Sequence, residues 1–263
     1  MTCDRPRRAG DNAGTLTLRW TAAIFAVALL LPATLGHARA EVPAGCEPPP
    51  KPQKLEATRP LNLGQLKLQL LYYRCTRYDA ELAGVLQAAH AWVDHSVARF
   101  KKPALVLDID ETSLSNWKQI HQNDFGYIVA GACDFSQGSA CGQTAWEHSA
   151  GAEPIRPTLD LFNAAKAKHV AVFFITGRHE SDDERAATET NLHQAGYAGW
   201  QHLYMRTNAF GGPSVAPFKT SARQDIESQG YTIIANVGDQ HSDLANGHAL
   251  RTFKLPNPFY YLP

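Results

Sequence analysis

The chain has 263 residues, of which 44% are hydrophobic and 19% are charged, enough apolar sequence for one packed domain or two small ones. This composition excludes a disordered, collagenous or coiled-coil chain. Basic and acidic residues balance at 25 each, and without the first 40 residues the formal charge is −3. A nucleic acid polymer is therefore not an expected partner.

The first 40 residues have the order of segments found in secretory signal peptides. Arginines come first, followed by the apolar run 20–31, Pro32 and the small-residue site 38–40. A membrane anchor is the alternative, but this run has twelve residues, whereas a span needs about 20. We predict a leader of residues 1–40 that is cleaved after Ala40, a protein exported to the periplasm or secreted, and no stable membrane span.

Four cysteines remain once this leader is removed: Cys46, Cys75, Cys133 and Cys141. An even number in an exported chain indicates two disulfides, and four cysteines allow three pairings. The spacing favours Cys133–Cys141 as a local clasp and Cys46–Cys75 as an N-terminal link. A zinc site is the alternative, and it is weak because the chain has no C-x-x-C pair and no nearby histidine cluster.

The region before the first expected strand divides into two parts. Residues 41–60 are rich in proline and polar residues, so we predict an extended lead-in there. Over residues 61–100 apolar residues recur every three or four positions, which predicts two amphipathic helices. Residues 114–151, which follow the first expected strand, have no strong period and contain both Cys133 and Cys141. We expect a small cap insert there.

Beyond residue 100 the pattern changes to short, nearly continuous apolar runs, which are typical of strands buried on both faces of a parallel sheet. Helical stretches lie between them. One begins with the capping-box pattern Ser181–Glu184 and should end at Gly196, and another should run from about Thr220 to Gln229. This alternation predicts a doubly wound α/β domain with a mainly parallel, Rossmann-like sheet over residues 61–263. The expected strands are 104–107, 170–175, 202–205, 232–237 and 252–255.

Three of the expected strands run into side chains that can carry chemistry. In an open α/β sheet, ligands bind just beyond the carboxyl ends of the strands, so these side chains should meet at one edge. Lys219, just ahead of the expected Thr220 helix, can add a positive charge there. The residues that follow the three strands are Asp108 and Asp110, then Thr176, Gly177 and Arg178, then Asp239 and Asp243.

Four carboxylates gathered at one edge repel one another unless a cation lies among them. Oxygen ligands, with few cysteines or histidines among the candidate residues, favour a hard ion such as Mg²⁺. A cation, a lysine and a hydroxyl around an aspartate suit phosphoryl transfer, in which the aspartate accepts the phosphoryl group. Each motif alone has a simpler explanation, such as a solvated turn or a surface lysine. The occurrence of all these motifs together, at strand ends, indicates phosphoryl transfer.

The same segments resemble the haloacid dehalogenase-like superfamily, in the acid phosphatase branch shared by plant acid phosphatases, vegetative storage proteins and bacterial class C acid phosphatases. The resemblance extends from about Leu61 to the C-terminus and implies a Mg²⁺-dependent phosphomonoesterase on a doubly wound fold. The segments that carry it are LDIDETSLSN (107–116), FITGRHE (174–180), NLHQAGYAGW (191–200), Lys219 followed by Arg223, NVGDQHSDL (236–244) and RTFKLPNPFYY (251–261).

In this family pattern Asp108 is the nucleophile, and Asp110 protonates the leaving oxygen and then activates water. An unperturbed aspartate titrates near about 3.9, so we expect the pKa of Asp110 to be raised and the activity optimum to be acidic. Some storage-protein relatives lack the nucleophile. This chain retains Asp108, which favours catalysis over a non-catalytic storage or binding protein. A phosphotransferase that passes the group to an alcohol shares the same intermediate and stays open.

The resemblance also implies the remaining site residues. Thr176, with Gly177 and Arg178 beside it, would bind the phosphoryl group, and Lys219 would neutralise it. Trp146 in the cap and Tyr260 in the tail are candidates for stacking on a base or aryl ring. The expected substrate is a small phosphomonoester, with nucleoside monophosphates as candidates. The implied Mg²⁺ set is Asp108, Asp110 through its backbone carbonyl, Asp239, and Asp243 as the anchor of Lys219 or of a metal-bound water.

Overall fold

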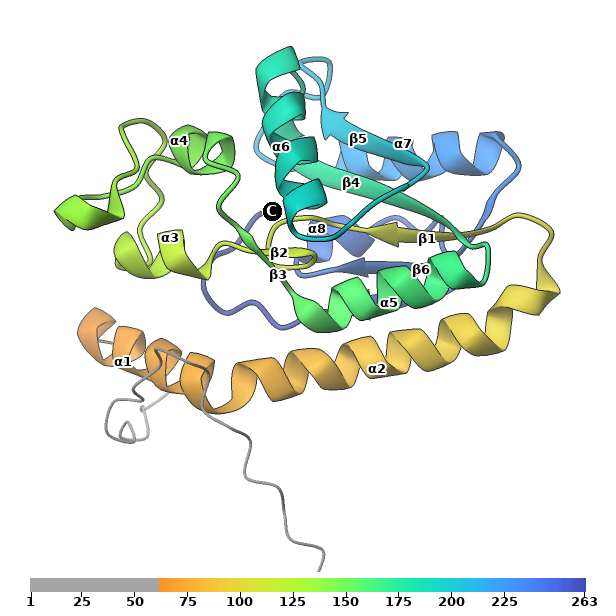
Figure 1. Cartoon of the computed structure of the whole chain (residues 1–263), viewed down its shortest axis with the longest axis horizontal. Coiled ribbons are helices and arrows are strands. Elements are labelled where there is room, and N and C mark those ends of the chain that lie inside the picture. Colours follow the sequence, from red (N-terminus) through yellow and green to blue (C-terminus); the bar gives the residue numbers. More distant parts are fainter. Residues whose placement is uncertain (1–61) are drawn as a thin grey trace, which may run out of the picture. The chain divides into compact units, whose positions relative to one another are not determined.

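The computed structural model describes residues 62–263 (Figure 1). The predicted leader, the lead-in and the pairing of Cys46 with Cys75 lie outside these residues and stay predictions. Within residues 62–263, no helix combines the length and the apolar character needed to cross a bilayer.

A five-stranded sheet, parallel throughout, forms the centre of this region (Figure 1). β1 lies in the middle, and the chain builds outward from it to β4 and β5 on one side and to β6 and β7 on the other. The predicted mainly parallel α/β fold is confirmed. In sheet order the strands are β5 (His202–Arg206), β4 (Ala171–His179), β1 (Pro103–Leu107), β6 (Thr232–Gly238) and β7 (Thr252–Lys254).

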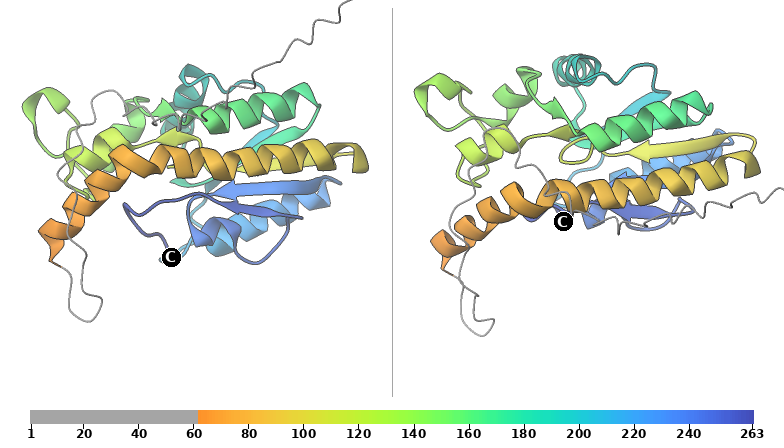
Figure 2. Two further views of the ribbon diagram at one scale, coloured as in Figure 1. Left: turned by 90° about the horizontal axis from the view of Figure 1, so that it is seen from below. Right: turned by 60° about the horizontal axis from the view of Figure 1, so that its bottom comes forward.

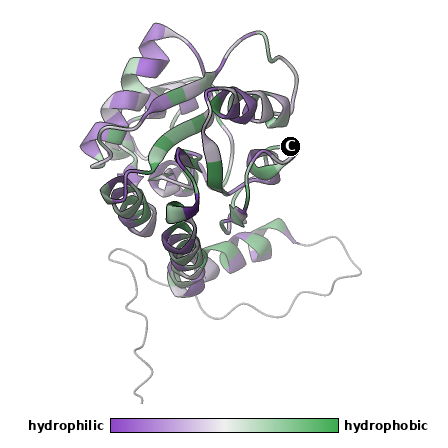
Figure 3. Ribbon diagram, turned by 90° about the vertical axis from the view of Figure 1, so that its right-hand side faces the viewer, coloured by the Kyte–Doolittle hydropathy of each residue, from purple (hydrophilic) through white to green (hydrophobic). Residues whose placement is uncertain are grey.

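Helices cover both faces of the sheet, which explains why β1 and most of β4 and β6 are continuous apolar runs. α2 (Asp79–Ser96) and α5 (Arg156–Ala167) run side by side over one face, as Figure 2 shows, and α7 (Ala216–Ser228) covers the other. Side chains alternate along β1. Leu105 and Leu107 therefore enter the hydrophobic core beneath α2 and α5, while Ala104 and Val106 enter the core beneath α7. Apolar colouring accordingly concentrates on the strands in Figure 3.

Two helices precede the sheet, in the region where the sequence predicts two amphipathic helices. α1 (Leu63–Tyr73) and α2 are joined by a five-residue π-helical turn, Arg74–Tyr78, so the helical path bends without being interrupted (Figure 1). Only α2 contributes fully buried residues to the core, among them Leu82, Leu86 and Val93.

The chain leaves the sheet after β1 and passes through an excursion before it enters α5 and returns to the sheet at β4. The short strands β2 (Leu114–Ser115) and β3 (Glu153–Pro154) pair antiparallel at the base of this excursion. Between them lie α3 (Trp117–Gln122), a 3₁₀ turn at Phe135–Gln137 and α4 (Gln143–His148). The predicted disulfide between Cys133 and Cys141 is present. We call residues 114–154 the cap.

The remaining helices follow the sequence signals with one correction. α6 (Asp182–Gln194) begins after Ser181, whose side chain accepts a hydrogen bond from the Glu184 amide, and Gly196 takes a φ of 96° just past its end. α7 begins at Ala216, four residues earlier than predicted, with a proline in its first turn. Lys219 therefore lies inside this helix, not ahead of it.

Arg223, also on α7, is fully buried and acts as an anchor for the loop after β6. Its guanidinium donates to the carbonyl oxygens of Asp243 at 2.7 Å and Gly247 at 3.0 Å, and also to that of Ala245. Because these acceptors lose a charged donor, we expect Arg223→Met to lower the free energy of unfolding by at least about 3 kcal/mol. Urea titration followed by circular dichroism measures this change.

A matched substitution on the surface gives the control for that experiment. The side chain of Arg77 is 68% exposed and pairs with Glu81, one helical turn away. Arg77→Met should leave the unfolding midpoint nearly unchanged. Equal loss of stability in the two variants would contradict the anchoring role of Arg223.

Candidate active site

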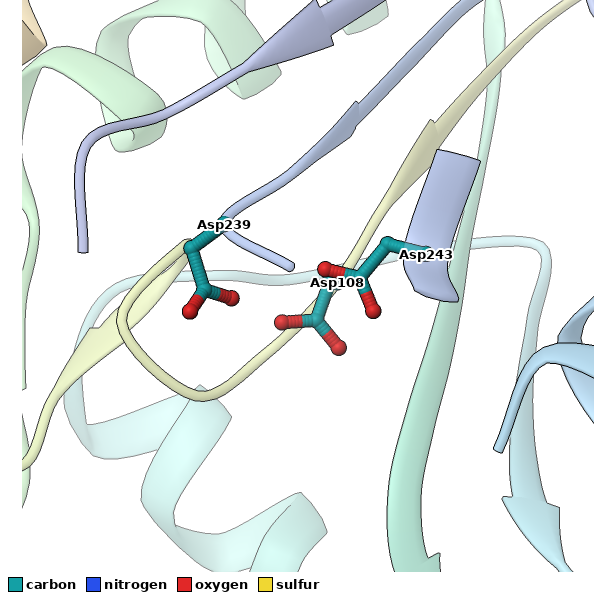
Figure 4. Close-up of side chains that lie close together, drawn as sticks. All are labelled: Asp108, Asp239 and Asp243. Carbon is teal, nitrogen blue, oxygen red and sulfur yellow. The ribbon is translucent and has the colours of Figure 1, made fainter. Parts of the chain in front are cut away.

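The carboxyl ends of β1 and β6 meet where the strand order reverses, the position at which open α/β sheets bind ligands. Asp108 follows β1 and Asp239 follows β6, and the amide of Asp108 donates to the carbonyl of Val237 at 3.0 Å. Asp243 joins them from α8 (His241–Leu244). All three carboxylates are buried, with oxygens within 4.8 Å of one another (Figure 4).

Local sequence forces Asp243 back toward the end of β6. The amide of Gln240 donates to Oδ2 of Asp243 at 2.8 Å, completing a capping box that begins α8. This return brings Asp243 so close to Gly238 that a Cβ on the glycine would lie 2.4 Å from the Cβ of Asp243. Glycine is therefore required at position 238 for the third carboxylate to enter the cluster.

Lys219 reaches the cluster from α7 and is only 3% exposed. Its ammonium donates to Oδ1 of Asp108 and to Oδ1 of Asp243, each at 2.5 Å. Burial acts to lower the pKa of Lys219, but the two carboxylates outweigh it and raise the pKa. The lysine is therefore charged. It links Asp108, which follows β1, to Asp243, which precedes β7.

One ammonium does not balance three buried carboxylates. Burial raises the pKa of Asp108 well above its usual range, and repulsion from Asp243 raises it further. Burial and repulsion from Asp243 also raise the pKa of Asp239 to about 7, although Asn257 and Gln240 each donate to its Oδ2 at 2.7 Å. Surplus negative charge on oxygen donors fits a hard divalent cation, so the residues present suit the Mg²⁺ that the sequence predicts.

Asp110 has a different environment, and the expectation of a raised pKa is wrong. Its Oδ1 accepts from Arg178 at 2.7 Å and from Asn116 at 2.9 Å, and its Oδ2 accepts from Arg178 at 3.1 Å. Burial acts to raise the pKa of Asp110, but the arginine charge and these hydrogen bonds outweigh it and hold the pKa below its usual range. The guanidinium of Arg178, 4% exposed, is bound to Asp110 and to Thr188.

The residues after Ile175 stay in the strand, so the prediction that β4 ends there is wrong. β4 continues to His179 through an irregular register, and the Oγ1 of Thr176 accepts from the amide of Arg178 at 3.2 Å. Because Phe174 pairs with Leu107, Thr176 and Asp108 follow at the same edge. A Cβ at Gly177 would lie 3.3 Å from Val215, so its small size lets α7 begin close to the strand.

The two aromatic residues proposed for stacking lie in unlike places. Trp146 is 2% exposed inside the cap, where its indole nitrogen donates to Oδ1 of Asn116 at 2.7 Å. This placement leaves no open ring face and does not suit a stacking platform. Tyr260 is half-buried in the tail, and its hydroxyl donates to Oε2 of Glu111 at 2.9 Å.

The tail contributes contacts that sequence reasoning missed. Asn257 holds Asp239, as noted above, and the backbone of Leu262 bonds with the side chains of Gln240 at 3.2 Å and Ser242 at 3.1 Å.

Glu111 was also missed by the sequence analysis. It is 1% exposed, at a φ of 53°, and the only available signal was its place directly after the D-x-D pair. Burial raises the pKa of Glu111 to about 7.

Residues 58–263 match the family model described as HAD superfamily, subfamily IIIB (acid phosphatase). The chain belongs to this family. It is 34% identical to the stem 28 kDa glycoprotein of Glycine max over 73% of this chain and 72% of that protein. It is 32% identical to acid phosphatase 1 of Solanum lycopersicum over 60% of this chain, spanning 58% of that protein. The acid phosphatase family and its acid phosphatase relatives support phosphomonoesterase activity.

The fold of this acid phosphatase family member has a solved counterpart. The class C acid phosphatase from Bacillus anthracis aligns with a TM-score of 0.59 and 21% sequence identity, covering 76% of this chain and 86% of that one. At this identity the likeness concerns the fold, and it agrees with the parallel sheet described above.

The raised carboxyl pKa values give a prediction for stability. Asp239 and Glu111 hold protons more tightly in the folded than in the unfolded chain. Their stabilising contribution is therefore present at low pH and is lost as the pH rises from about 4 to 7. We expect the protein in EDTA to melt at a lower temperature at pH 8 than at pH 5.5. Mg²⁺ should raise the melting temperature more at pH 8, where the carboxylates are ionised.

Differential scanning fluorimetry at both pH values, with EDTA or Mg²⁺, checks this prediction. Ca²⁺ and Na⁺ at matched ionic strength show whether the effect is specific to a small divalent ion. A stabilisation by Mg²⁺ that is equal at both pH values, or larger at pH 5.5, would contradict it.

Proposed function

We propose that the chain is an exported, Mg²⁺-dependent acid phosphatase that hydrolyses small phosphomonoesters through an aspartyl phosphate on Asp108. The observation that carries the proposal is the buried cluster of Asp108, Asp239 and Asp243, with Lys219 bonded to two of them. In this proposal residues 1–40 are the cleaved leader, 41–60 the lead-in, and 61–263 the catalytic domain. Export delivers the enzyme to the periplasm or the medium.

Asp108 is the nucleophile of the proposed reaction. Lys219 bonds its Oδ1, while within residues 62–263 no hydrogen bond engages its Oδ2. The new bond forms between the Asp108 carboxylate and phosphorus as the bond to the leaving oxygen breaks, and the electron pair of that bond goes to the leaving oxygen. Water then attacks phosphorus, which restores the carboxylate and releases inorganic phosphate. Thr176 and Lys219 bind the phosphoryl oxygens.

The cation site consists of the oxygens that lack a positive partner of their own. Asp108 and Asp239, with the backbone carbonyl of Asp110, would hold Mg²⁺. The bound ion would neutralise charge on the phosphoryl oxygens. Asp243 has a different role, because its two oxygens already accept from Lys219 and from the Gln240 amide. It positions the lysine.

In the free site, the pKa shifts of Asp108 and Asp110 are opposite to those that catalysis needs. Asp108 must be ionised to attack, yet its pKa is raised, and Asp110 must be protonated to act as an acid, yet its pKa is lowered. A cation held beside Asp108 would lower the pKa of Asp108, and a phosphoryl dianion near Asp110 would raise the pKa of Asp110. Cation and substrate together would therefore shift both carboxyls toward the charge state that catalysis needs.

The proposed substrates are small phosphomonoesters, with nucleoside monophosphates as candidates. The half-buried ring of Tyr260, tied to the site through Glu111, supports a place for a ring beside the phosphate. Turnover of a panel of phosphomonoesters by the mature protein, with Mg²⁺ and with EDTA, tests the substrate class. Adding an alcohol and analysing the products separates hydrolysis from phosphoryl transfer to the acceptor.

Replacement of the nucleophile is the most direct test. Asp108→Asn removes the attacking carboxylate but keeps the side-chain shape, so kcat for p-nitrophenyl phosphate should fall by more than about 1,000-fold. Circular dichroism should show an unchanged fold. Asp160→Asn, on the exposed face of α5, makes the same change away from the site and should retain full activity. A largely active Asp108→Asn enzyme would show that another group attacks phosphorus.

The pairing of Arg178 with Asp110 predicts a pH effect. Removal of the guanidinium in Arg178→Gln should raise the pKa of Asp110, so the acid keeps its proton to higher pH. The alkaline limb of the kcat/KM profile should therefore move to higher pH, even though the maximum rate falls. The control is Arg185→Gln, which removes a charge that is paired with Glu180. This variant should leave the alkaline limb at the same pH. If the alkaline limb of Arg178→Gln stays in place or moves to lower pH, Asp110 is not the acid that this limb reports.

A further inference from the structure

The side-chain amide of Asn116 connects the cap to Asp110. Asn116 follows β2 and is 4% exposed. Its Nδ2 donates to Oδ1 of Asp110 at 2.9 Å and to Oε2 of Glu111 at 3.1 Å, and its Oδ1 accepts from the indole nitrogen of Trp146 at 2.7 Å. The amide therefore lies between two acidic residues of the site and α4 of the cap.

Only one orientation of this amide satisfies all three neighbours. An indole nitrogen can only donate, and an ionised carboxylate, such as that of Asp110 in the free site, can only accept. The amide oxygen must therefore face Trp146, and the NH₂ group must face Asp110 and Glu111. With the amide reversed, its oxygen would oppose two carboxylates, and the indole N–H would lie buried against another donor. Trp146 thus determines which end of Asn116 meets the acid.

We propose that Asn116 is a positioning residue for Asp110 and that Trp146 makes this positioning dependent on the cap. The inference rests on the proposed role of Asp110 as general acid. Oδ1 of Asp110 receives two donors, from Arg178 and Asn116, whereas Oδ2 receives one longer bond. Asn116 therefore distinguishes the two oxygens and leaves Oδ2 to pass its proton to the leaving oxygen as the bond to phosphorus breaks.

A comparison of leaving groups tests this role, because only poor leaving groups need the proton. We expect Asn116→Ala and Trp146→Phe to lower kcat/KM for glycerol phosphate about 10- to 100-fold more than for p-nitrophenyl phosphate, both measured with Mg²⁺. Trp92→Phe is the matched control. It removes an indole bond of 2.8 Å to the Ile234 carbonyl, remote from Asp110, and should leave the ratio of the two substrates at the wild-type value.

The outcomes separate this role from a structural one and from failure of the proposed function. An equal fall on both substrates in both variants overturns the positioning role of Asn116. A changed ratio in Asn116→Ala but not in Trp146→Phe overturns the part assigned to the cap. Where circular dichroism shows that Asn116→Ala does not fold, Asn116→Ser is judged by the same ratio. A wild-type protein that turns over neither substrate refutes the phosphatase function itself.

Discussion

The contact between Lys219 and two aspartates is the interaction on which the rest of the site depends. Burying several carboxylates in one place is costly unless positive charge is buried with them. The ammonium of Lys219 meets this need in part, and it comes from the opposite face of the sheet to α2 and α5. The core packing of α7 therefore serves the chemistry, because it fixes where the one buried ammonium of the cluster lies.

The incomplete compensation is itself informative. A fully neutralised cluster would be a stable structural feature with no need of a ligand. Here Asp239 keeps hydrogen bonds from Asn257 and Gln240 but has no basic partner among the described residues. The free protein thus has an excess of negative charge at this cluster, which a bound cation would relieve.

Much of the fold, and the grouping of the acidic residues, could be predicted from the sequence. The three central strands are nearly continuous apolar runs, and parallel strands align their carboxyl ends, so Asp108 and Asp239 were expected at the same edge of the sheet. That β1 and β6 lie next to each other is known only from the structure. The pairing of Asp110 with Arg178 could not be predicted, because it depends on the irregular register by which β4 continues past Ile175. The predicted start of α7, at Thr220, is four residues too late, although Pro217 is a typical first-turn residue.

The parallel pairing of β1 with β6 also has a consequence for how the enzyme becomes active. The two strands are separated by most of the domain, including the cap, β4, β5 and α7, so their contact is highly non-local. Such contacts form late, since the entropy of closing a long loop must first be overcome. Asp108 and Asp239 are far apart in an unfolded chain and meet only when β1 pairs with β6. The carboxylate cluster is therefore completed only late in folding.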